Sequence, residues 1–355
     1  VYKRQLLNNV LAAVNLDGNR FFYVNPLEAD GKHPFNHGTA GRAPWFGTAC
    51  CPSNMARLLP QVPGMTYAHD DRDVYITFYA ESRTEITVDD VSVELRQQTD
   101  YPNDGEVSLV VNPSKPTKFR VLLRIPTWIH RQFVPGALYR YVDSTSETVS
   151  LTVNGQPVSM LLDKGFVAID RQWKAGDRVL LSLPMPVRIS ECHPAVTANQ
   201  NRIALTRGPF VLCAEGVDNG GATQRFFFAK QPEVSDAEVS TNTIDSGSFL
   251  QVRMSAQAVT EDKSIEHSPL ILTPYYAWNN RGVSSMTVWF PLDPELAVFN
   301  PHSLPKESVF SKVTASHTFA DDTVTAIGDG KEPRNSSGKK VPRWTSRPQK
   351  NTPQW

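Results

Sequence analysis

The chain has 355 residues, 40% of them hydrophobic, which is enough for two or three domains with ordinary hydrophobic cores. Its 36 Lys and Arg residues equal its 36 Asp and Glu residues, which argues against a nucleic-acid partner held mainly by charge. No run of about 18 apolar residues occurs, so no membrane-spanning helix is expected. Four cysteines are too few for a disulfide scaffold, and they do not fix the cellular compartment.

Helical patterns and a long loop make up residues 1–66. A helix is predicted over Lys3–Val14, where apolar residues recur at helical spacing. Phe21–Pro26 is a short apolar run, either a strand or extended chain, and Glu28–Pro44 is polar and glycine-rich, which is typical of a long loop. Pro52 favours the first turn of a second helix, and Pro60 favours the end of that helix.

The apolar period changes to two from about Tyr67, which is typical of β-strands. Asn154-Gly155 predicts a two-residue hairpin turn, and Lys174–Asp177 joins two further strands. Many short strands with regular turns indicate a β-sandwich over residues 67–185, and similar patterns predict a second β-rich domain over residues 186–300. The segments that carry strand patterns include 73–80, 84–95, 106–111, 119–126, 202–216, 249–254 and 284–291.

The composition shifts again after Pro301, and residues 301–355 are predicted to be a linker and the start of a further module. Lys331–Lys350 is rich in basic residues, and we interpret it as solvated linker or loops rather than as a site for an anionic ligand. The chain opens inside the first helical pattern and closes without a final element, so it is expected to be part of a longer parent protein.

Cys50 and Cys51 stand side by side directly before Pro52, whereas the other two cysteines lie far away. Four interpretations of this doublet are open: two buried apolar side chains, a strained vicinal disulfide, two ligands of a structural zinc, or a nucleophile held by such a metal. Adjacent cysteines lack the usual CxxC spacing of zinc sites, so the spacing alone favours the first interpretation.

His33 and His37 raise the likelihood of a metal, because His37 lies thirteen residues before Cys50 (50 − 37). Two histidines and two cysteines in this short stretch could close a tetrahedral zinc site. The alternative, which we favour, is that both histidines line a solvated loop.

Four segments occur in the same order as in one known group of enzymes: DGNRFFYVNPLEADGKH, PWFGTACCPSNMARLLP, TRGPFVLCAEGVD and LTPYYAWNNRGVSSMTVWFP. Together they resemble glycoside hydrolase families 127 and 146, the cysteine-dependent β-L-arabinofuranosidases, over roughly residues 1–300. The resemblance implies an (α/α)6 barrel followed by β-sandwich domains. The expected fold is therefore mainly β, with tandem β-sandwich domains preceded by the last helices of a truncated (α/α)6 barrel over residues 1–66.

The resemblance implies chemistry for three residues. Cys50 would be the nucleophile and a zinc ligand, Cys51 a second zinc ligand, and Tyr23 a residue of the sugar pocket, with simple packing as the alternative for Tyr23. Zinc deprotonates a coordinated thiol, so the thiolate would attack and hydrolysis would proceed with retention through a thioglycosyl-enzyme. The implied partner is an arabinofuranose-containing oligosaccharide or glycan of plant arabinan or pectic type.

The sequence departs from the family pattern in one respect. The family's remaining zinc ligands, in a Glu-x-Cys arrangement, and its acid/base glutamate precede the doublet, whereas here Glu191 and Cys192 are adjacent and no Glu-x-Cys occurs. The missing ligands are expected upstream, and this chain alone is expected to be inactive. For the parent protein we expect a periplasmic or secreted location, with a homodimer left open. Thr314–Trp355 faintly resembles the opening strands of a discoidin-like module.

A second hypothesis is a non-catalytic carbohydrate-binding or structural β-sandwich protein, whose doublet would resist alkylation and bind no metal. Tyr275, Tyr276 and Trp278 could form a sugar-stacking platform, but a core role is favoured for them. Cys192 and Cys213 are interpreted as core residues rather than as a disulfide pair.

Overall fold

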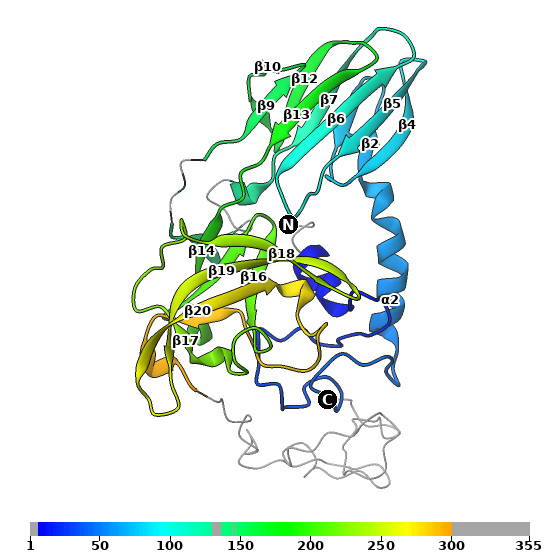
Figure 1. Cartoon of the computed structure of the whole chain (residues 1–355). Helices are drawn as coiled ribbons and strands as arrows, with labels where there is room; N and C mark the ends of the chain where they lie inside the picture. Colours follow the sequence, from blue (N-terminus) through cyan, green and yellow to red (C-terminus); the bar gives the residue numbers. More distant parts are fainter. Residues whose placement is uncertain (1–5, 130–135, 144, 146, 300–355) are drawn as a thin grey trace, which may run out of the picture.

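The structure, a computed structural model, describes residues 6–129, 136–143, 145 and 147–299. The linker and module predicted over residues 301–355 lie outside the described residues, as do residues 3–5 of the first predicted helix. The described chain is mainly β, with two β-sandwich domains preceded by a segment of helices and loops (Figure 1). We call residues 6–66 the N-terminal segment, residues 67–185 the first sandwich and residues 186–299 the second sandwich.

The N-terminal segment begins with two short helical turns, neither of them α-helical, instead of the predicted helix. These are the π-helical turn η1 (Leu6–Val10) and the 3-10 turn η2 (Leu11–Ala13). Phe21 then forms isolated bridges with Val14 and Ala43, so the apolar run that starts there is extended chain rather than a strand. The long predicted loop follows, and it contains only the short strand β1 (Glu28–Ala29).

Helix α2 (Cys50–Leu58) begins at the cysteine doublet, which confirms the second predicted helix. The 3-10 turns η3 (Leu59–Gln61) and η4 (Pro63–Met65) follow it. Each of these turns contains a proline, which lacks the N–H that would continue an α-helical ladder. In Figure 1, α2 runs along one side of the molecule from the N-terminal loops up to the first sandwich.

The first sandwich consists of a six-stranded sheet, in the order β10-β9-β13-β6-β5-β4, and a five-stranded sheet, in the order β11-β12-β7-β3-β2. Alternate residues of its strands are buried, and both sheets contribute side chains to one apolar core. Its elements are β2 (Tyr67–His69), β3 (Asp73–Ile76), β4 (Ser82–Val88), β5 (Val91–Gln98), β6 (Glu106–Pro113), β7 (Thr117–Arg124), η5 (Thr127–Ile129), β9 (Ser150–Val153), β10 (Gln156–Pro157), β11 (Leu162–Asp163), β12 (Phe166–Trp173) and β13 (Asp177–Ser182).

The turns of this sandwich agree with the sequence signals in part. Asn154 and Gly155 have φ values of 50° and 79°, which confirms the predicted hairpin turn. The strand pattern over residues 84–95 is a hairpin rather than one strand, because Asp89 and Asp90 also adopt positive φ. The strands on either side of Lys174–Asp177 are present, but β12 and β13 lie in opposite sheets.

The second sandwich is built from one branched sheet of eleven strands, whose main path is β17-β19-β20-β16-β15-β14-β8. Two of the eleven strands come from outside residues 186–299: β1 belongs to the N-terminal segment, and β8 lies within residues 67–185. Strands from both arms of this path enclose a single core. Its elements are β8 (Tyr139–Tyr141), β14 (Val187–Cys192), η6 (Thr197–Asn199), β15 (Arg202–Arg207), β16 (Phe210–Glu215), η7 (Thr223–Arg225), β17 (Phe226–Phe227), β18 (Glu238–Ile244), β19 (Gly247–Val259), β20 (Ile265–Pro274), η8 (Tyr275–Ala277), β21 (Met286–Thr287), β22 (Trp289–Pro291) and η9 (Pro294–Leu296).

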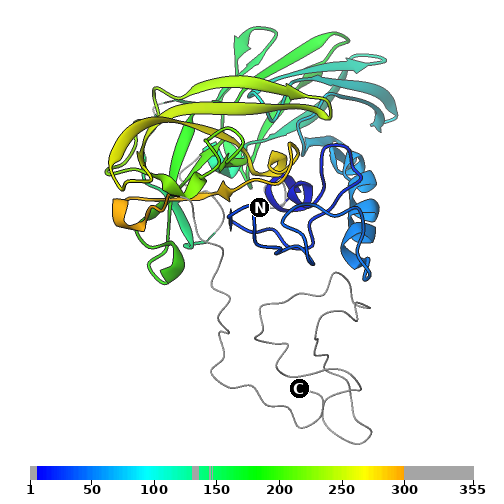
Figure 2. The same cartoon turned by 60° about the horizontal axis from the view of Figure 1, so that its bottom comes forward.

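The N-terminal segment packs on the second sandwich through a third apolar cluster. Phe22 stacks on Trp278 with ring centroids 4.9 Å apart, and β1 pairs with β21. Trp278 is fully buried and Tyr275 almost so, which confirms their core role and excludes an exposed sugar-stacking platform at these two residues. Figure 2 shows the N-terminal loops lying between this sandwich and α2, so the contact fixes the loops that reach the cysteine doublet.

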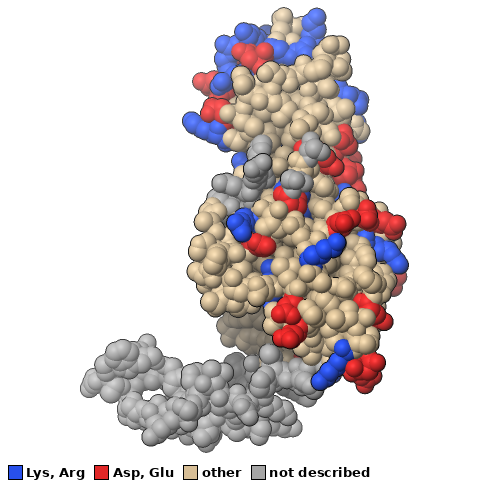
Figure 3. Space-filling model, turned by 90° about the vertical axis from the view of Figure 1, so that its left-hand side faces the viewer, with Lys and Arg blue, Asp and Glu red and all other residues tan. Residues whose placement is uncertain are grey.

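The surface of the described residues carries both signs of charge. On the face shown in Figure 3, acidic and basic side chains are interspersed over both sandwiches, in keeping with equal totals of the two kinds of residue. Within the part of the chain that the structure describes, no helix is long and apolar enough to cross a membrane.

Candidate active site

The cysteine doublet forms the first turn of α2. Ala49 at the N-cap provides no side-chain hydrogen bond, so the first backbone N–H groups of the helix have no side-chain cap there. The positive end of the helix dipole acts on Cys50 at this position and favours its thiolate over its thiol. The hydroxyl of Ser53 donates to the carbonyl oxygen of Cys50 at 3.1 Å and fixes this turn.

Two of the four interpretations of the doublet are wrong. All four cysteines are free, which excludes the vicinal disulfide and also a Cys192–Cys213 disulfide. Cys50 is exposed and Cys51 is half-buried, so the doublet is not a pair of buried apolar side chains. Cys213 is fully buried, as predicted for a core residue, whereas Cys192 is only half-buried.

Tyr23 lies directly against the exposed thiol. Its Oη is 3.2 Å from Sγ of Cys50, within hydrogen-bonding distance for a sulfur partner. The Tyr23 ring contacts Phe46 edge-on, with centroids 5.2 Å apart, and His37 edge-on at 4.3 Å. The structure thus brings together Tyr23 and Cys50, which are 27 residues apart in the sequence.

The two thiols of the doublet differ in acidity. The hydrogen bond with Tyr23 lowers the pKa of the Cys50 thiol below its usual value. Burial, followed by the neighbouring Cys50, raises the pKa of the Cys51 thiol. The same hydrogen bond with Cys50 raises the pKa of Tyr23 to about 12, so this phenol stays protonated and can donate to a thiolate. Cys50 is therefore the thiol prepared to ionise.

The four-ligand metal site of His33, His37, Cys50 and Cys51 is not assembled. The described residues contain no group of three or more His, Cys, Asp or Glu side chains arranged to hold a metal ion. His37 packs its ring on Tyr23, and the backbone N–H of His33 donates to Oδ1 of Asp30 at 2.7 Å. Both histidines therefore belong to the loop, as the favoured alternative predicted.

The doublet can supply only two of the four donors that a tetrahedral zinc site needs. The side chains of Cys50 and Cys51 contact each other, and adjacent soft thiolates suit Zn²⁺. A tetrahedral site needs two further donors, and the described residues do not supply them around the doublet. The doublet can therefore hold zinc only together with ligands outside the described residues.

Two residues of this region escaped the sequence analysis. Phe46 is buried beneath the Tyr23 and His37 rings, and Asn36 is fully buried and hydrogen-bonded to the backbone of Tyr23. The Asn36-His37-Gly38 sequence is a turn signal that marks the place, but nothing in the sequence shows that the Asn36 side chain faces inward.

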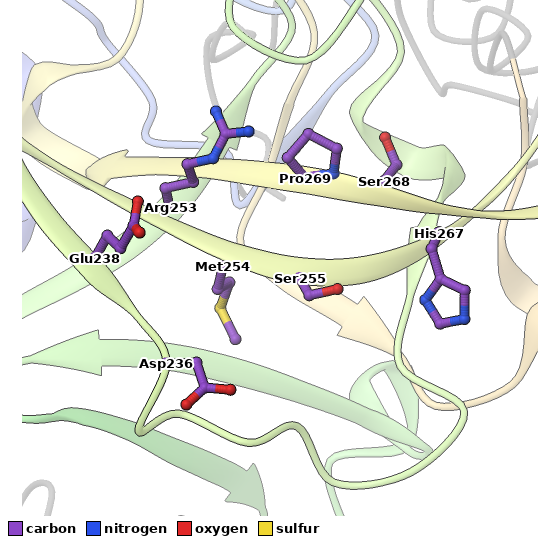
Figure 4. Close-up of a pocket in the computed structure, with 8 residues that line it drawn as sticks. All are labelled: Asp236, Glu238, Arg253, Met254, Ser255, His267, Ser268 and Pro269. Carbon is purple, nitrogen blue, oxygen red and sulfur yellow. The ribbon is translucent and has the colours of Figure 1, made fainter.

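A surface hollow lies on the second sandwich, and none of its lining residues belongs to the region around the doublet. Its volume is about 370 Å³, and strands β18, β19 and β20 line most of it. Figure 4 shows its charged side chains pointing in different directions, with Arg253 on one side and Asp236 and His267 on the other. Because these groups do not converge on a common point, the hollow lacks the arrangement of a catalytic site.

Three family models match the chain in consecutive order. They describe the GH127 catalytic domain of β-L-arabinofuranosidase over residues 1–64, the GH127 middle domain over residues 73–185 and the C-terminal domain of glycoside hydrolase family 127 over residues 187–291. The chain is also 31% identical over 316 residues to a non-reducing end β-L-arabinofuranosidase of Bifidobacterium longum subsp. longum, covering 81% of this chain and 44% of that relative.

Solved structures agree with this result. A GH127 β-arabinofuranosidase is 36% identical with a TM-score of 0.76, over 83% of this chain and 46% of that chain. A GH127 β-L-arabinofuranosidase from Geobacillus stearothermophilus T6 is 33% identical with a TM-score of 0.68, over 81% and 45%. The chain thus spans slightly less than half the length of these relatives. The resemblance and the tandem sandwiches are both confirmed, and the chain belongs to glycoside hydrolase family 127.

Proposed function

We propose that the protein containing this chain hydrolyses β-L-arabinofuranosides with retention of configuration, using Cys50 as the nucleophile. The observation that carries the proposal is the contact between Tyr23 Oη and Cys50 Sγ, 3.2 Å apart, at an exposed helix N-terminus. The names of the relatives support the substrate class. The activity is proposed for the whole protein, because the chain spans less than half the length of those relatives.

The first chemical step is attack by the Cys50 thiolate on the anomeric carbon. The new S–C bond forms as the bond from that carbon to the glycosidic oxygen breaks, and the leaving oxygen takes a proton from an acid. Tyr23 holds the thiolate in place by donating its phenolic proton in a hydrogen bond. Water then attacks the same carbon and gives a proton to the conjugate base of that acid, the S–C bond breaks to restore the thiolate, and the sugar leaves with its original configuration.

Zinc is the cofactor we propose for this centre, held by Cys50 and Cys51 with further ligands from outside the described residues. When bound, the metal would keep a coordinated thiol deprotonated at neutral pH. Cys51 suits the role of permanent ligand because it is half-buried and less acidic without metal than its neighbour. Cys50 keeps its exposed side free for the sugar.

The proton donor is the second group that the reaction needs from elsewhere. The groups that act most strongly on the Cys50 thiol are Tyr23, Cys51 and nearby backbone, and no carboxylate is among them. We therefore propose that this chain alone does not turn over natural glycans, whose leaving oxygen must be protonated. The proposed natural partner of the whole protein is an arabinofuranose-containing plant glycan of arabinan or pectic type.

A substrate with an activated leaving group tests the nucleophile without the missing acid. Nitrophenolate leaves without protonation, so p-nitrophenyl β-L-arabinofuranoside should transfer its sugar to Cys50 of the whole zinc-loaded protein, which supplies the metal ligands that the described residues lack, even when the acid is removed. We expect a burst of nitrophenolate that Cys50→Ser abolishes. Cys192→Ser is the matched control, because Cys192 is a free, partly exposed thiol in the second sandwich, and the burst should survive in it.

The alternative function, a non-catalytic binding protein with an inert doublet, makes the opposite prediction. It requires Cys50 to react with iodoacetamide no faster than Cys192. The exposure of Cys50 and its contact with Tyr23 speak against inertness. A burst that is equally large in Cys50→Ser, or absent from the unaltered whole protein at saturating substrate, would favour this alternative.

A further inference from the structure

Asn36 holds the backbone of Tyr23 through a fully buried side-chain amide. Its Oδ1 accepts from the Tyr23 backbone N–H at 2.7 Å. Its Nδ2 donates to the carbonyl oxygens of Phe21, at 3.1 Å, and Gly41, at 2.8 Å. One side chain thus joins the extended chain that carries Tyr23 to the loop that follows it, although neither belongs to a regular strand.

The extended chain at Tyr23 has two faces that serve different purposes. Because successive side chains of extended chain point to opposite sides, Phe22 enters the core beside Trp278 while Tyr23 points to Cys50. The Phe22 backbone N–H donates to the carbonyl oxygen of Ala13 at 2.8 Å. Phe22 is therefore anchored by the core and by Ala13, whereas the backbone N–H of Tyr23 is anchored by Asn36.

Asn36 also begins the turn that places His37 on the Tyr23 ring. The Asn36 backbone N–H donates to Thr39, and the Thr39 N–H donates back to Asn36. His37 and Gly38 between them have φ values of 49° and 87°, as a type I′ turn requires. The left-handed conformation at His37 is uncommon for a residue with a Cβ, and it accompanies a ring contact with Tyr23 at 4.3 Å.

We propose that Asn36 is a positioning residue of the reactive centre, which acts on Cys50 only by holding the Tyr23 phenol against its sulfur. A buried polar side chain with all its hydrogen bonds satisfied fixes one local arrangement, because each lost bond leaves an orphaned buried group. The inference rests on the proposed role of the Tyr23–Cys50 pair and extends it to a residue that touches neither the sulfur nor the sugar.

Asn36→Asp is the informative variant, because it is nearly isosteric and keeps the acceptor while it removes both donors. Asn219 offers a matched control in the second sandwich. It is also buried, donates to the carbonyl oxygens of Glu215 and Ile271 at 2.8 Å, and accepts from the Ile271 N–H at 3.0 Å. Asn219→Asp therefore removes the same number of bonds within the second sandwich, at a side chain that bonds to Glu215 and Ile271 rather than to Tyr23.

The readout is the rate at which iodoacetamide alkylates Cys50 at one fixed pH in the metal-free chain, measured by peptide mass spectrometry. Tyr23→Phe should change the rate about threefold, because it removes the hydrogen bond to the Cys50 sulfur. Asn36→Asp should change it in the same direction by a similar factor. The double variant should react at the same rate as Tyr23→Phe, since Asn36 acts through the Tyr23 hydroxyl. Asn219→Asp should leave the rate unchanged.

The outcomes separate this inference from the proposed function. If Tyr23→Phe changes the alkylation rate but Asn36→Asp does not, the positioning role is overturned and the Tyr23–Cys50 pair stands. If Tyr23→Phe has no effect, the pair itself is overturned, and the role of Asn36 falls with it. Should Asn36→Asp fail to fold, hydrogen exchange of the unaltered chain decides. The Tyr23 amide should be protected as strongly as that of Phe22, and free exchange at Tyr23 would overturn the inference.

Discussion

Arg42 is the residue whose replacement should loosen the N-terminal segment from the second sandwich. Its guanidinium is buried and donates to the carbonyl oxygens of Ala12 at 2.9 Å, Trp278 at 2.5 Å and Tyr276 at 3.3 Å. It also lies 4.4 Å from the centre of the Phe22 ring. One side chain thus joins η2, the loop that carries Arg42, and η8 with the residue that follows it.

The size of the effect follows from two opposing contributions. Hydrogen bonds to a charged group contribute about 1.5–3 kcal/mol each, so the three bonds of Arg42 contribute about 5–9 kcal/mol. Burial lowers the pKa of Arg42 to about 10. Relative to the usual value of about 12.5, keeping the buried charge costs about 3 kcal/mol. Arg42→Met, which fills the space of the stem without donors, should therefore lower the free energy of unfolding by about 2–6 kcal/mol.

Urea denaturation with residue-resolved hydrogen exchange measures this loss. Exchange is needed because a chain of several domains need not unfold in one step. The protection of Phe22 should fall in Arg42→Met, while that of the first sandwich should hold. Arg178→Met is the control, since Arg178 is exposed and its change should stay within about 0.5 kcal/mol. Equal stabilities for the two variants would refute the reasoning.

Two other predictions concern the first sandwich. A Cβ at Gly105 would lie 1.8 Å from the carbonyl oxygen of Leu183, so Gly105→Ala should destabilise the chain by more than about 2 kcal/mol in thermal denaturation, whereas Gly64→Ala, which meets open space, should not. Burial acts to raise the pKa of Asp177, but the hydrogen bond from Asn154 and other donors hold it below its usual value. The unfolded chain therefore binds this proton more tightly, so the stabilisation is present above about pH 4 and is lost as the pH falls through the folded pKa. Asp177→Asn should flatten the acid limb of the stability curve, and an unchanged limb would contradict this assignment.

The elements that local patterns control were predictable from the sequence. The period of two marked the strands of the first sandwich, the Asn154-Gly155 pair marked its hairpin turn, and Pro52 with Pro60 marked the limits of α2. These signals work because each reports a local backbone preference or the burial of one face. They say nothing about which strands pair, so the placement of β12 and β13 in opposite sheets could not be predicted.

Some residues of the candidate site could be predicted from the sequence, and others could not. Cys50 and Tyr23 were reached through the resemblance to a family, not through spacing, because they are 27 residues apart and mostly irregular loop lies between them. Asn36 and Arg42 lie in a loop whose composition predicts solvent exposure, yet both are buried. Their burial depends on the core formed with Trp278, which belongs to a distant part of the chain. A polar residue in a loop therefore shows its role only when the tertiary contacts are known.

The two cysteines of the doublet differ in exposure and in acidity. Two adjacent residues of the same type occupy different environments, because Cys50 faces solvent and Tyr23 while Cys51 turns toward the protein. Environment alone thus distinguishes the two thiols, in the way that the proposed roles of nucleophile and metal ligand require.

The most direct test of Cys50 as the nucleophile is to identify the residue that carries the sugar. The whole zinc-loaded protein would be mixed with p-nitrophenyl β-L-arabinofuranoside, quenched in acid during the burst, digested and analysed by peptide mass spectrometry. The account predicts one pentosyl group on the peptide that contains the doublet, located at Cys50 by fragmentation and absent from Cys50→Ser. A pentosyl group on Cys51 or on any other residue, or sugar transfer that persists in Cys50→Ser, would contradict it.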